Sequence, residues 1–334
     1  MSYTTTNFTE KSGNMTLAEG IGVSNAKIIL IGEHSAVYGQ PAIVIPLTSI
    51  QLTASTTPIQ SGQYIDSNYY TGPLQRAYKN LAGVKKLILT VLQQLNQTNA
   101  NFKLTIKSAI PSERGMGSSA AAAIAIIRSL YAYFEQPLNR ATLLRLANVA
   151  ETVTHGNPSG MDAATTSAHA PIWFVRGEQS HNLPINASGY LVIADSGMKG
   201  QTGPAVATVR DRLADFPQET DVFMKQLGAL AVTARDALAN NQLTTLGTCL
   251  SHAQIILQTL GVSNDTIDHL VFLAQHNGSL GTKLTGGGRG GCIIVLAPDK
   301  ATATHLIDVL TTAGATQTWL QPLAHLNAAN EVQN

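Results

Sequence analysis

The chain has few of the residues that mark a disulfide scaffold, a nucleic-acid surface or a membrane span. Its two cysteines, Cys249 and Cys292, have neither a metal-ligand spacing nor a disulfide framework. Charged residues make up 12%, the net charge is +1, and no lysine or arginine run would follow a nucleic-acid backbone. Neither an export signal nor about 18 uninterrupted apolar residues is present. These shortages favour a cytoplasmic protein with no nucleic-acid or membrane partner.

The sequence does contain enough apolar residues for more than one core. Hydrophobic residues make up 44% of 334 residues, a length above the usual size of a single-core domain. A turn-forming segment at 186–189 precedes a new apolar run at 190–194. We therefore expect an N-terminal nucleotide-phosphate and catalytic domain over residues 1–185 and a C-terminal domain over residues 186–334.

Alternating and helical patterns predict an α+β fold in both halves. In the first half we expect strands at 26–31, 42–47 and 103–110, and helices near 84–95, 120–130 and 140–154. The polar stretch 53–72 reads as an extended hairpin or a mobile loop. In the second half we expect strands at 190–194, 292–296 and 316–321, and helices near 203–214, 219–239, 242–260, 264–275 and 299–313.

The segment most informative about function is 111–123, in which glycines and hydroxyls come directly before an alanine-rich helix. Gly115 and Gly117 would let the main chain approach a polyphosphate, and the first helical turn offers unpaired N–H groups and a positive dipole end. It is not a Walker A loop, because no Gly-Lys-Ser/Thr follows at the required spacing. A Gly/Ser turn that merely caps a core helix is the alternative. The predicted nucleotide-binding residues are Pro111, Glu113, Arg114, Gly115, Met116, Gly117, Ser118, Ser119 and Ala120.

Two further groups of polar residues suit one reaction centre. Lys27 begins an apolar strand, and Glu33 and His34 follow its end, so the three could meet one small ligand. Glu151 and Asp162 are separated by a tight turn, and such carboxylates can divide the work, one binding Mg²⁺ and the other contacting a nucleophilic hydroxyl. A solvated lysine and surface capping by either acid are the alternatives.

Two segments of the second half also carry polar or glycine-rich turns. Thr202 follows a strand and opens a helix, where its hydroxyl either touches a phosphate or simply starts the helix. The loop 286–291 formally satisfies Gly-x-Gly-x-x-Gly, but it runs into an apolar strand instead of a helix, so it is not a dinucleotide fingerprint. It either wraps a substrate, supports the phosphate loop or is a flexible turn.

Taken in order, these segments resemble the three motifs of the GHMP kinase superfamily, which comprises galactokinases, homoserine kinases, mevalonate kinases and phosphomevalonate kinases. Within it, Ile31-Gly-Glu-His-Ser-Ala-Val-Tyr-Gly39 and His155-Gly-Asn-Pro-Ser-Gly-Met-Asp162 are most similar to the mevalonate kinase family. The resemblance implies a ribosomal protein S5 domain 2-like N-terminal domain, a ferredoxin-like α/β C-terminal domain and an active site in the cleft between them. It also implies ATP-dependent phosphorylation of mevalonate to 5-phosphomevalonate, with Mg²⁺, in isoprenoid biosynthesis.

The resemblance also implies the role of each matching residue. Asp162 matches the catalytic aspartate, Lys27 the lysine near the substrate hydroxyl, and Glu151 with Ser118 or Ser119 the Mg²⁺ ligands. The remaining implied substrate-side residues are Glu33, His34, Thr202, Gly287 and Gly288. Relatives include homodimers, so a homodimer is one expectation.

Three residues depart from the family pattern. Arg289 replaces a glycine of many relatives, and its guanidinium either pairs with a substrate carboxylate or points to solvent. Glu113 and Arg114 stand at positions that are usually small, and they are expected to pair with each other. The alternatives to a mevalonate kinase are a phosphomevalonate kinase, another small-metabolite kinase of the superfamily and a non-catalytic nucleotide-binding sensor. Galactokinase is disfavoured by the apolar 35–37 segment after Gly-Glu-His.

Overall fold

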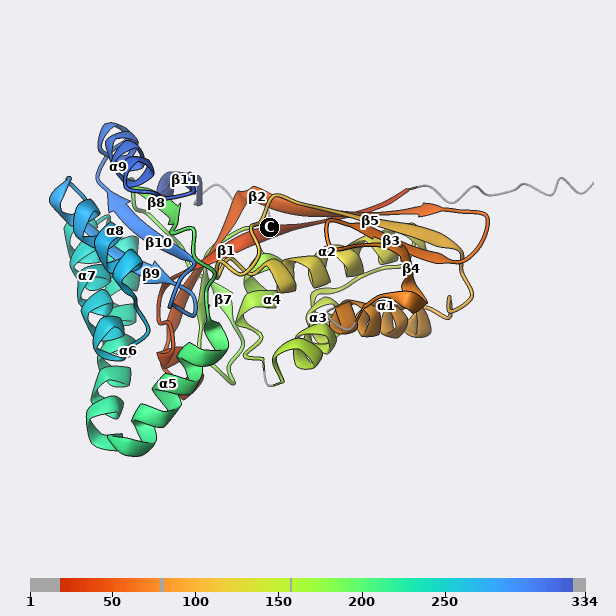
Figure 1. Cartoon of the computed structure of the whole chain (residues 1–334), viewed down its shortest axis with the longest axis horizontal. Helices are drawn as coiled ribbons and strands as arrows, with labels where there is room; N and C mark the ends of the chain where they lie inside the picture. The colour runs from red at the N-terminus through yellow and green to blue at the C-terminus, as the bar shows by residue number, and fades with distance from the viewer. Residues whose placement is uncertain (1–18, 79–80, 157, 327–334) are drawn as a thin grey trace, which may run out of the picture.

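The computed structural model describes residues 19–78, 81–156 and 158–326. Two sheets with their helices lie side by side along the longest axis of the molecule (Figure 1). The predicted α+β architecture is confirmed. Asn157, which belongs to the second quoted motif, and the first 18 residues lie outside the described ranges.

The first sheet has seven strands in the order β4-β3-β5-β2-β6-β7, and β1 pairs with β2 off this path. Its pairs are antiparallel except for β3 with β5. The strands are β1 (Gly20–Ile31), β2 (Ala42–Pro58), β3 (Gln63–Ser67), β4 (Tyr70–Pro73), β5 (Phe102–Ser108), β6 (Ile172–Phe174) and β7 (His181–Asn182). The helices of this part are α1 (Ala82–Gln94), α2 (Ser118–Tyr133), α3 (Arg140–His155) and α4 (Met161–Thr166).

Helix α2 packs so closely on β1 that side chains are excluded at two positions of the strand. A Cβ at Gly20 or Gly22 would overlap the α2 backbone near Ser129 or Ala125. The helix is rich in alanine on its inner side and is almost fully buried. Its N-terminal end, where the predicted phosphate loop lies, is therefore held firmly against β1.

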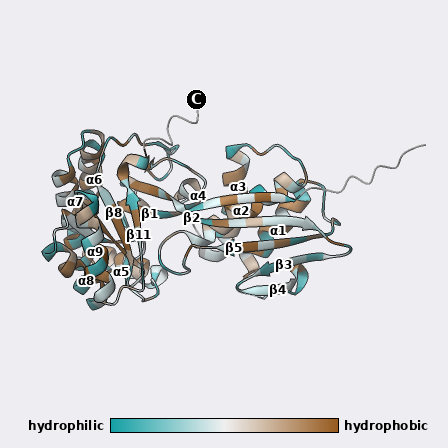
Figure 2. Cartoon of the chain, turned by 90° about the horizontal axis from the view of Figure 1, so that it is seen from above, coloured by the Kyte–Doolittle hydropathy of each residue, from teal (hydrophilic) through white to brown (hydrophobic). Residues whose placement is uncertain are grey.

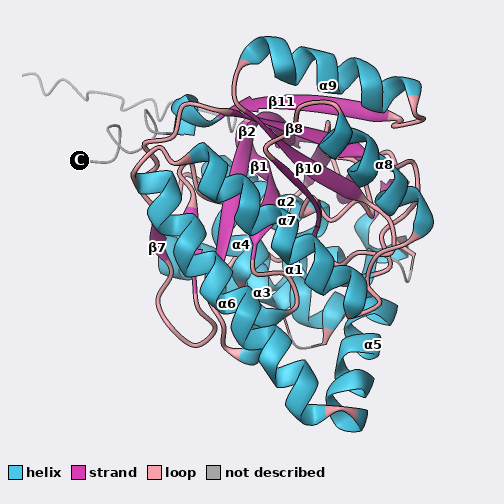
Figure 3. Cartoon of the chain, turned by 90° about the vertical axis from the view of Figure 1, so that its left-hand side faces the viewer, coloured by secondary structure: helices cyan, strands magenta, loops and turns pink. Residues whose placement is uncertain are grey.

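The second sheet has four antiparallel strands in the order β11-β8-β10-β9. Its strands are β8 (Tyr190–Asp195), β9 (Gly281–Thr285), β10 (Cys292–Ala297) and β11 (Gln317–Pro322). Its helices are α5 (Thr202–Asp215), α6 (Pro217–Ala239), α7 (Leu243–Thr259), α8 (Asp265–His276) and α9 (Lys300–Thr312). Figure 3 shows α6 and α7 side by side in front of the strands, with α9 at the outer edge.

One hydrophobic core joins the two sheets. The same buried cluster contains Ile28 and Ile45 of the first sheet and Ile193 and Ile294 of the second. Helix α6 belongs to the second part but also contacts β1 and β2. Hydrophobic residues accordingly recur along the strands and helices of both parts (Figure 2). The space between the sheets is therefore bordered by one continuous hydrophobic core.

Most predicted elements are confirmed, because their signals are local. Asn139 accepts a hydrogen bond from the Thr142 N–H at 2.9 Å and caps α3 as expected. The stretch 53–72 is not a mobile loop, since β2 continues to Pro58 and β3 and β4 follow. Four elements were missed, the short helix α4 and the strands β6, β7 and β9. Lys283 made β9 look like part of the glycine loop, whereas all five residues of that strand are buried.

Within the described ranges, no helix combines the length and the apolar character needed to cross a lipid bilayer.

Candidate active site

A cavity of about 960 Å³ lies between the two parts of the molecule. The predicted phosphate loop, the start of α5 and the loop after β9 line one region of it. Apolar residues of β2, β3, β5 and α1 also line it, namely Leu52, Ile65, Ile106 and Val84. A second hollow of about 410 Å³ between α6 and α7 contains none of the predicted site residues. The larger cavity is therefore the candidate active site.

The phosphate loop has the backbone that its glycines suggest. Gly115 and Gly117 have φ angles of 77° and 75°, in the left-handed region that favours glycine. Gly117 is the N-cap of α2 and provides no side-chain cap, so the first-turn N–H groups keep their capacity for a bound anion. Ser118 and Ser119 form this first turn and line the cavity.

The glycines also allow protein segments to meet. A Cβ at Gly117 would lie 2.8 Å from Cγ of Lys27, and one at Gly115 would lie 3.0 Å from the Thr285 carbonyl oxygen. The whole predicted loop lines the cavity except Ala120, which is buried behind it. The Ala120 side chain packs inside α2, so the predicted contact of this residue with a nucleotide would be through its backbone N–H.

Lys27 and Asp162 form an ion pair beside the loop. Lys27 Nζ lies 3.0 Å from Oδ1 of Asp162. The lysine side chain is 4% exposed, whereas the aspartate is 37% exposed and lines the cavity. Two elements position them: the Lys27 N–H donates to the Met116 carbonyl at 3.0 Å, and Asp162 lies in the first turn of α4. The arrangement presents a carboxylate to the cavity with a buried ammonium group behind it.

Glu151 lies close enough to this pair to feel both charges. Burial and, to a smaller extent, the Asp162 charge raise the pKa of Glu151 to about 7, while the Lys27 charge opposes the shift. The residue is 4% exposed and comes from α3. A divalent cation would stabilise the ionised forms of both carboxylates.

These residues fit Mg²⁺. This ion is typically held by one or two carboxylates, with phosphate oxygens and water completing its octahedron. No group of three or more metal-ligating His, Cys, Asp or Glu side chains occurs in the described parts of the chain. A site built from Glu151 and a Ser118 or Ser119 hydroxyl therefore suits a cation that arrives with a phosphate.

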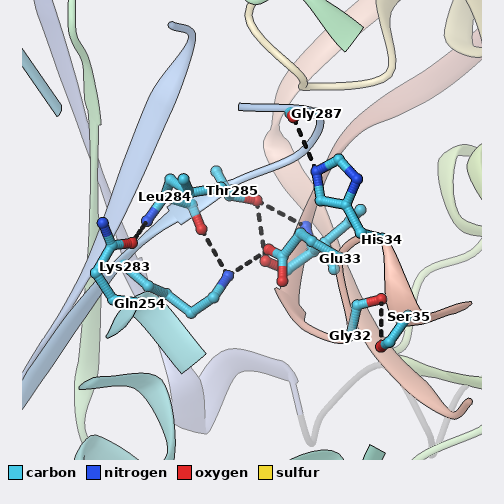
Figure 4. Close-up of polar contacts among 10 residues, drawn as sticks. Gly32, Glu33, His34, Ser35, Gln254, Lys283, Leu284, Thr285 and Gly287 are labelled. Atoms are coloured by element: carbon cyan, nitrogen blue, oxygen red, sulfur yellow. Dashed lines mark hydrogen bonds and ion pairs between the residues drawn. The ribbon is translucent and has the colours of Figure 1, made fainter. Parts of the chain in front are cut away.

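Glu33 and His34 lie at the seam between the two sheets (Figure 4). The Glu33 carboxylate binds Lys283 Nζ, which also donates to the Leu284 carbonyl at 2.6 Å, and both ion-pair side chains are 0% exposed. Burial raises the pKa of Glu33 and lowers that of Lys283, each against the effect of its partner. The prediction that Glu33 contacts the substrate is wrong, because its side chain is fully buried and its carboxylate binds Lys283.

His34 extends the same seam. Its Nε2 lies 3.0 Å from the Gly287 carbonyl oxygen, so this nitrogen carries the proton and donates. Burial lowers the pKa of His34 to about 4, with the nearby Lys283 charge acting in the same direction. The imidazole is therefore neutral at pH 7 and holds the glycine loop in place.

The structure brings Thr202 and the glycine loop together. Thr202 opens α5 and lines the cavity with Gly287 and Gly288. A Cβ at Gly287 would overlap the Thr202 side chain, and the Gln201 N–H donates to the Gly288 carbonyl at 3.1 Å. These three predicted residues thus lie together at the cavity, which Asp162 also lines.

One predicted arginine contact is wrong. Arg114 does not pair with Glu113; its Nε lies 2.7 Å from Asp195 Oδ1, while Glu113 pairs with Lys199. Adjacent side chains in this left-handed loop point to different partners. Arg289 is partly exposed, and it donates to Thr208 Oγ1 at 2.9 Å and to the Gly261 carbonyl at 3.2 Å.

The sequence interpretation missed three residues that organise the site: Lys283, Thr285 and Asp195. Thr285 Oγ1 accepts from the Ile29 N–H at 3.0 Å and donates to the Ile29 carbonyl at 2.9 Å, which ties β9 to β1. The available signal was a lone charged residue within or at the end of an apolar strand, which is costly unless it is paired.

Comparison with known proteins gives a consistent result. The family model of the GHMP kinases N terminal domain matches residues 82–169, and that of the GHMP kinases C terminal matches residues 234–316. A mevalonate kinase of Aeropyrum pernix is 31% identical over 280 residues, covering 81% of this chain and 86% of the relative. A mevalonate kinase of Pyrococcus furiosus is 29% identical over 310 residues, covering 84% and 90%.

A solved structure adds a similarity of fold. The crystal structure of mevalonate kinase from methicillin-resistant Staphylococcus aureus MRSA252 is 32% identical to this chain. It matches with a TM-score of 0.71 and covers 91% of this chain and 99% of that one. The similarity therefore extends across both sheets and the cavity between them.

Removing one partner of the buried Glu33–Lys283 pair is expected to destabilise the fold more than replacing both partners with apolar residues. Lys283→Met leaves a carboxyl group buried without its partner and should lower the free energy of unfolding by about 3 kcal/mol. The double variant Glu33→Met/Lys283→Met removes both charges and should recover most of that loss. Urea unfolding followed by circular dichroism measures both.

The control for this prediction is Lys103→Met, which breaks the exposed Lys103–Asp66 pair. It should change the free energy of unfolding by less than about 1 kcal/mol. If Lys283→Met lowers the free energy of unfolding by no more than Lys103→Met does, the buried ion pair does not stabilise the fold as predicted.

The buried His34 predicts a pH dependence of stability. Its pKa is lowered from 6.5 to about 4 in the folded chain, so between these values the unfolded state binds more protons. The free energy of unfolding should therefore fall as pH drops through this window, by about 2 kcal/mol at pH 5 from this group. His34→Gln keeps a donor for the Gly287 carbonyl but does not titrate.

The measurement is urea unfolding of wild type and His34→Gln at pH 7 and pH 5. Other groups contribute equally to both proteins, so the difference between their pH slopes isolates His34. Equal slopes would contradict the prediction.

Proposed function

The chain belongs to the GHMP kinase family, and we infer that it is a mevalonate kinase, which transfers the γ-phosphate of ATP to the primary hydroxyl of mevalonate. The product is 5-phosphomevalonate, an intermediate of isoprenoid biosynthesis by the mevalonate pathway. The relatives named mevalonate kinase span most of this chain and most of their own length. The observation that carries the chemistry is the Lys27–Asp162 pair facing the cavity beside the phosphate loop.

Phosphoryl transfer requires alignment and charge neutralisation more than covalent help from the protein. We propose that the first turn of α2 binds the ATP phosphates through its N–H groups, with the helix dipole favouring their charge. Asp162 orients the mevalonate hydroxyl and accepts its proton as the bond to phosphorus forms. Lys27 holds Asp162 in place and stabilises the negative charge that develops on the attacking oxygen.

Mg²⁺, when bound, would neutralise charge on the phosphates. We propose that Glu151 and either Ser118 or Ser119 hold it. Thr202, Gly287 and Gly288 would line the cavity on the substrate side, and the residues of the phosphate loop would surround the nucleotide tail. The division into domains 1–185 and 186–334 is part of the same proposal, since β7 and β8 lie on either side of it. A homodimer and a cytoplasmic location stay predictions from the sequence.

Turnover of four candidate substrates tests the proposed function. The purified chain is mixed with MgATP and mevalonate, phosphomevalonate, galactose or homoserine, and ADP release is followed. We expect rapid ADP formation with mevalonate only, because the chain matches relatives named mevalonate kinase over most of their length. Turnover of another acceptor, or nucleotide binding without ADP formation, would contradict the proposal.

Asp162→Asn should lower kcat by about 10²-fold or more, because the amide cannot accept the hydroxyl proton. The affinity for MgATP should stay nearly unchanged, since the phosphate loop is not altered. Steady-state kinetics and calorimetric titration with MgADP separate the two effects. A parallel loss of affinity and turnover would instead place Asp162 in the phosphate site or in the folding of α4.

A further inference from the structure

The Arg114–Asp195 ion pair connects the phosphate loop to the end of β8. Nε of Arg114 lies 2.7 Å from Oδ1 and 2.8 Å from Oδ2 of Asp195. Arg114 Nη2 also donates to the Gly197 carbonyl at 3.3 Å, and the Gly197 N–H donates to Asp195 Oδ1 at 2.9 Å. The two side chains are only 16% and 6% exposed. This is a restrained, largely desolvated charge pair, unlike the exposed pairs on the helices.

Backbone contacts reinforce the connection at the same place. The Gly200 N–H donates to the Glu113 carbonyl at 2.7 Å. A Cβ at Gly291 would lie 2.8 Å from the Arg114 carbonyl oxygen, so the end of the glycine loop packs directly on Arg114. The turn after β8 and the start of β10 thus enclose residues 113–114. We call the Arg114–Asp195 pair with the Gly200–Glu113 hydrogen bond the loop clamp.

The phosphate loop needs such support because its backbone is not locally favoured. Glu113 has a φ of 58°, in the left-handed region that is unfavourable for a non-glycine residue. Gly115 and Gly117 also have positive φ, and glycine is the residue with the most conformational freedom to lose. Without outside contacts, this loop would have to be ordered by the nucleotide itself. That ordering would reduce the observed affinity.

The loop clamp also lies close to the start of α5. The turn that holds Arg114 leads within a few residues to Thr202, which lines the same cavity as the phosphate loop. The five-residue segment 196–200 therefore joins the contacts of the phosphate loop to the first residue of α5.

We propose that Arg114 and Asp195 are positioning residues that hold the phosphate loop in its nucleotide-binding conformation before the nucleotide arrives. The proposal rests on the proposed function and goes beyond it, because it assigns Arg114 a role through Asp195 instead of direct phosphate binding. Nε of Arg114 is committed to both carboxylate oxygens, and the paired charges largely cancel at the loop. Asp195 is thereby part of the nucleotide site although it does not line the cavity.

Opposite effects of Asp195→Asn distinguish a positioning role from direct binding. The amide keeps the size of the side chain and one carbonyl oxygen for Gly197 but loses the charge that holds Arg114. If Arg114 is a positioning residue, Asp195→Asn and Arg114→Met should each weaken MgADP binding by about 10-fold, and the double variant should be little worse than either. If Arg114 binds phosphate directly, Asp195→Asn frees the guanidinium and should leave binding unchanged or tighten it. That second result would overturn the proposal.

The experiment is calorimetric titration of the full chain with MgADP, with thermal unfolding recorded for every variant. Arg210→Met is the matched control, because it removes an arginine from the exposed Arg210–Asp211 pair and should change MgADP binding less than about 2-fold. Arg114→Lys is the second variant should Asp195→Asn fail to fold. It keeps the charge but not the guanidinium fork, so binding weakened about 3-fold or more supports the loop clamp, and wild-type binding overturns it.

Steady-state kinetics adds a readout that a merely structural role would not move. The KM for ATP should rise in the clamp variants, while the KM for mevalonate stays within about 2-fold of wild type. If the wild-type chain binds MgADP but does not turn over mevalonate, the proposed substrate is wrong. The titration with MgADP then still tests the loop clamp. A wild-type chain that does not bind MgADP would overturn both proposals.

Discussion

A fully buried ion pair joins the two sheets, and the geometry of the cavity depends on it. Glu33 follows β1 and Lys283 lies in β9, 250 residues later, and neither side chain is exposed. Two charges removed from water are costly unless they are paired at short range, so this contact permits very little relative movement of the sheets. Thr285 and His34 add hydrogen bonds on either side of the pair, to Ile29 and Gly287. The seam is therefore specified by polar groups that have few alternative partners.

Strand β1 transmits this constraint to the reaction centre. Ile29 is tied to β9, and two residues earlier Lys27 donates its N–H to the phosphate loop and its Nζ to Asp162. One strand thus fixes the seam, the phosphate loop and Asp162 relative to one another. Close packing of α2 on Gly20 and Gly22 prevents this strand from shifting along the helix. A reaction that depends on alignment within a fraction of an ångström benefits from such a shared support.

The sequence predicted what depends on neighbouring residues. The cap at Asn139, the loop before α2 and the order of strands and helices were readable because each signal lies within a few positions. The ion-pair partners of charged residues could not be predicted from neighbouring residues. Arg114 was expected to pair with its neighbour, yet its carboxylate comes from a residue 81 positions away. Glu33 was interpreted as a ligand because burial, which decides its role, is a property of the folded chain.

Two glycines also contact protein segments that could not be predicted from the sequence. Gly115 and Gly287 were expected to admit a substrate, and both do line the cavity. Each is also required by a protein neighbour, since a Cβ would meet Thr285 in one case and Thr202 in the other. The two glycine-containing loops are therefore packed against other segments, and their backbones are ordered by the fold. Such pre-ordering lowers the entropy that nucleotide binding must remove, which favours both affinity and the in-line arrangement that phosphoryl transfer needs.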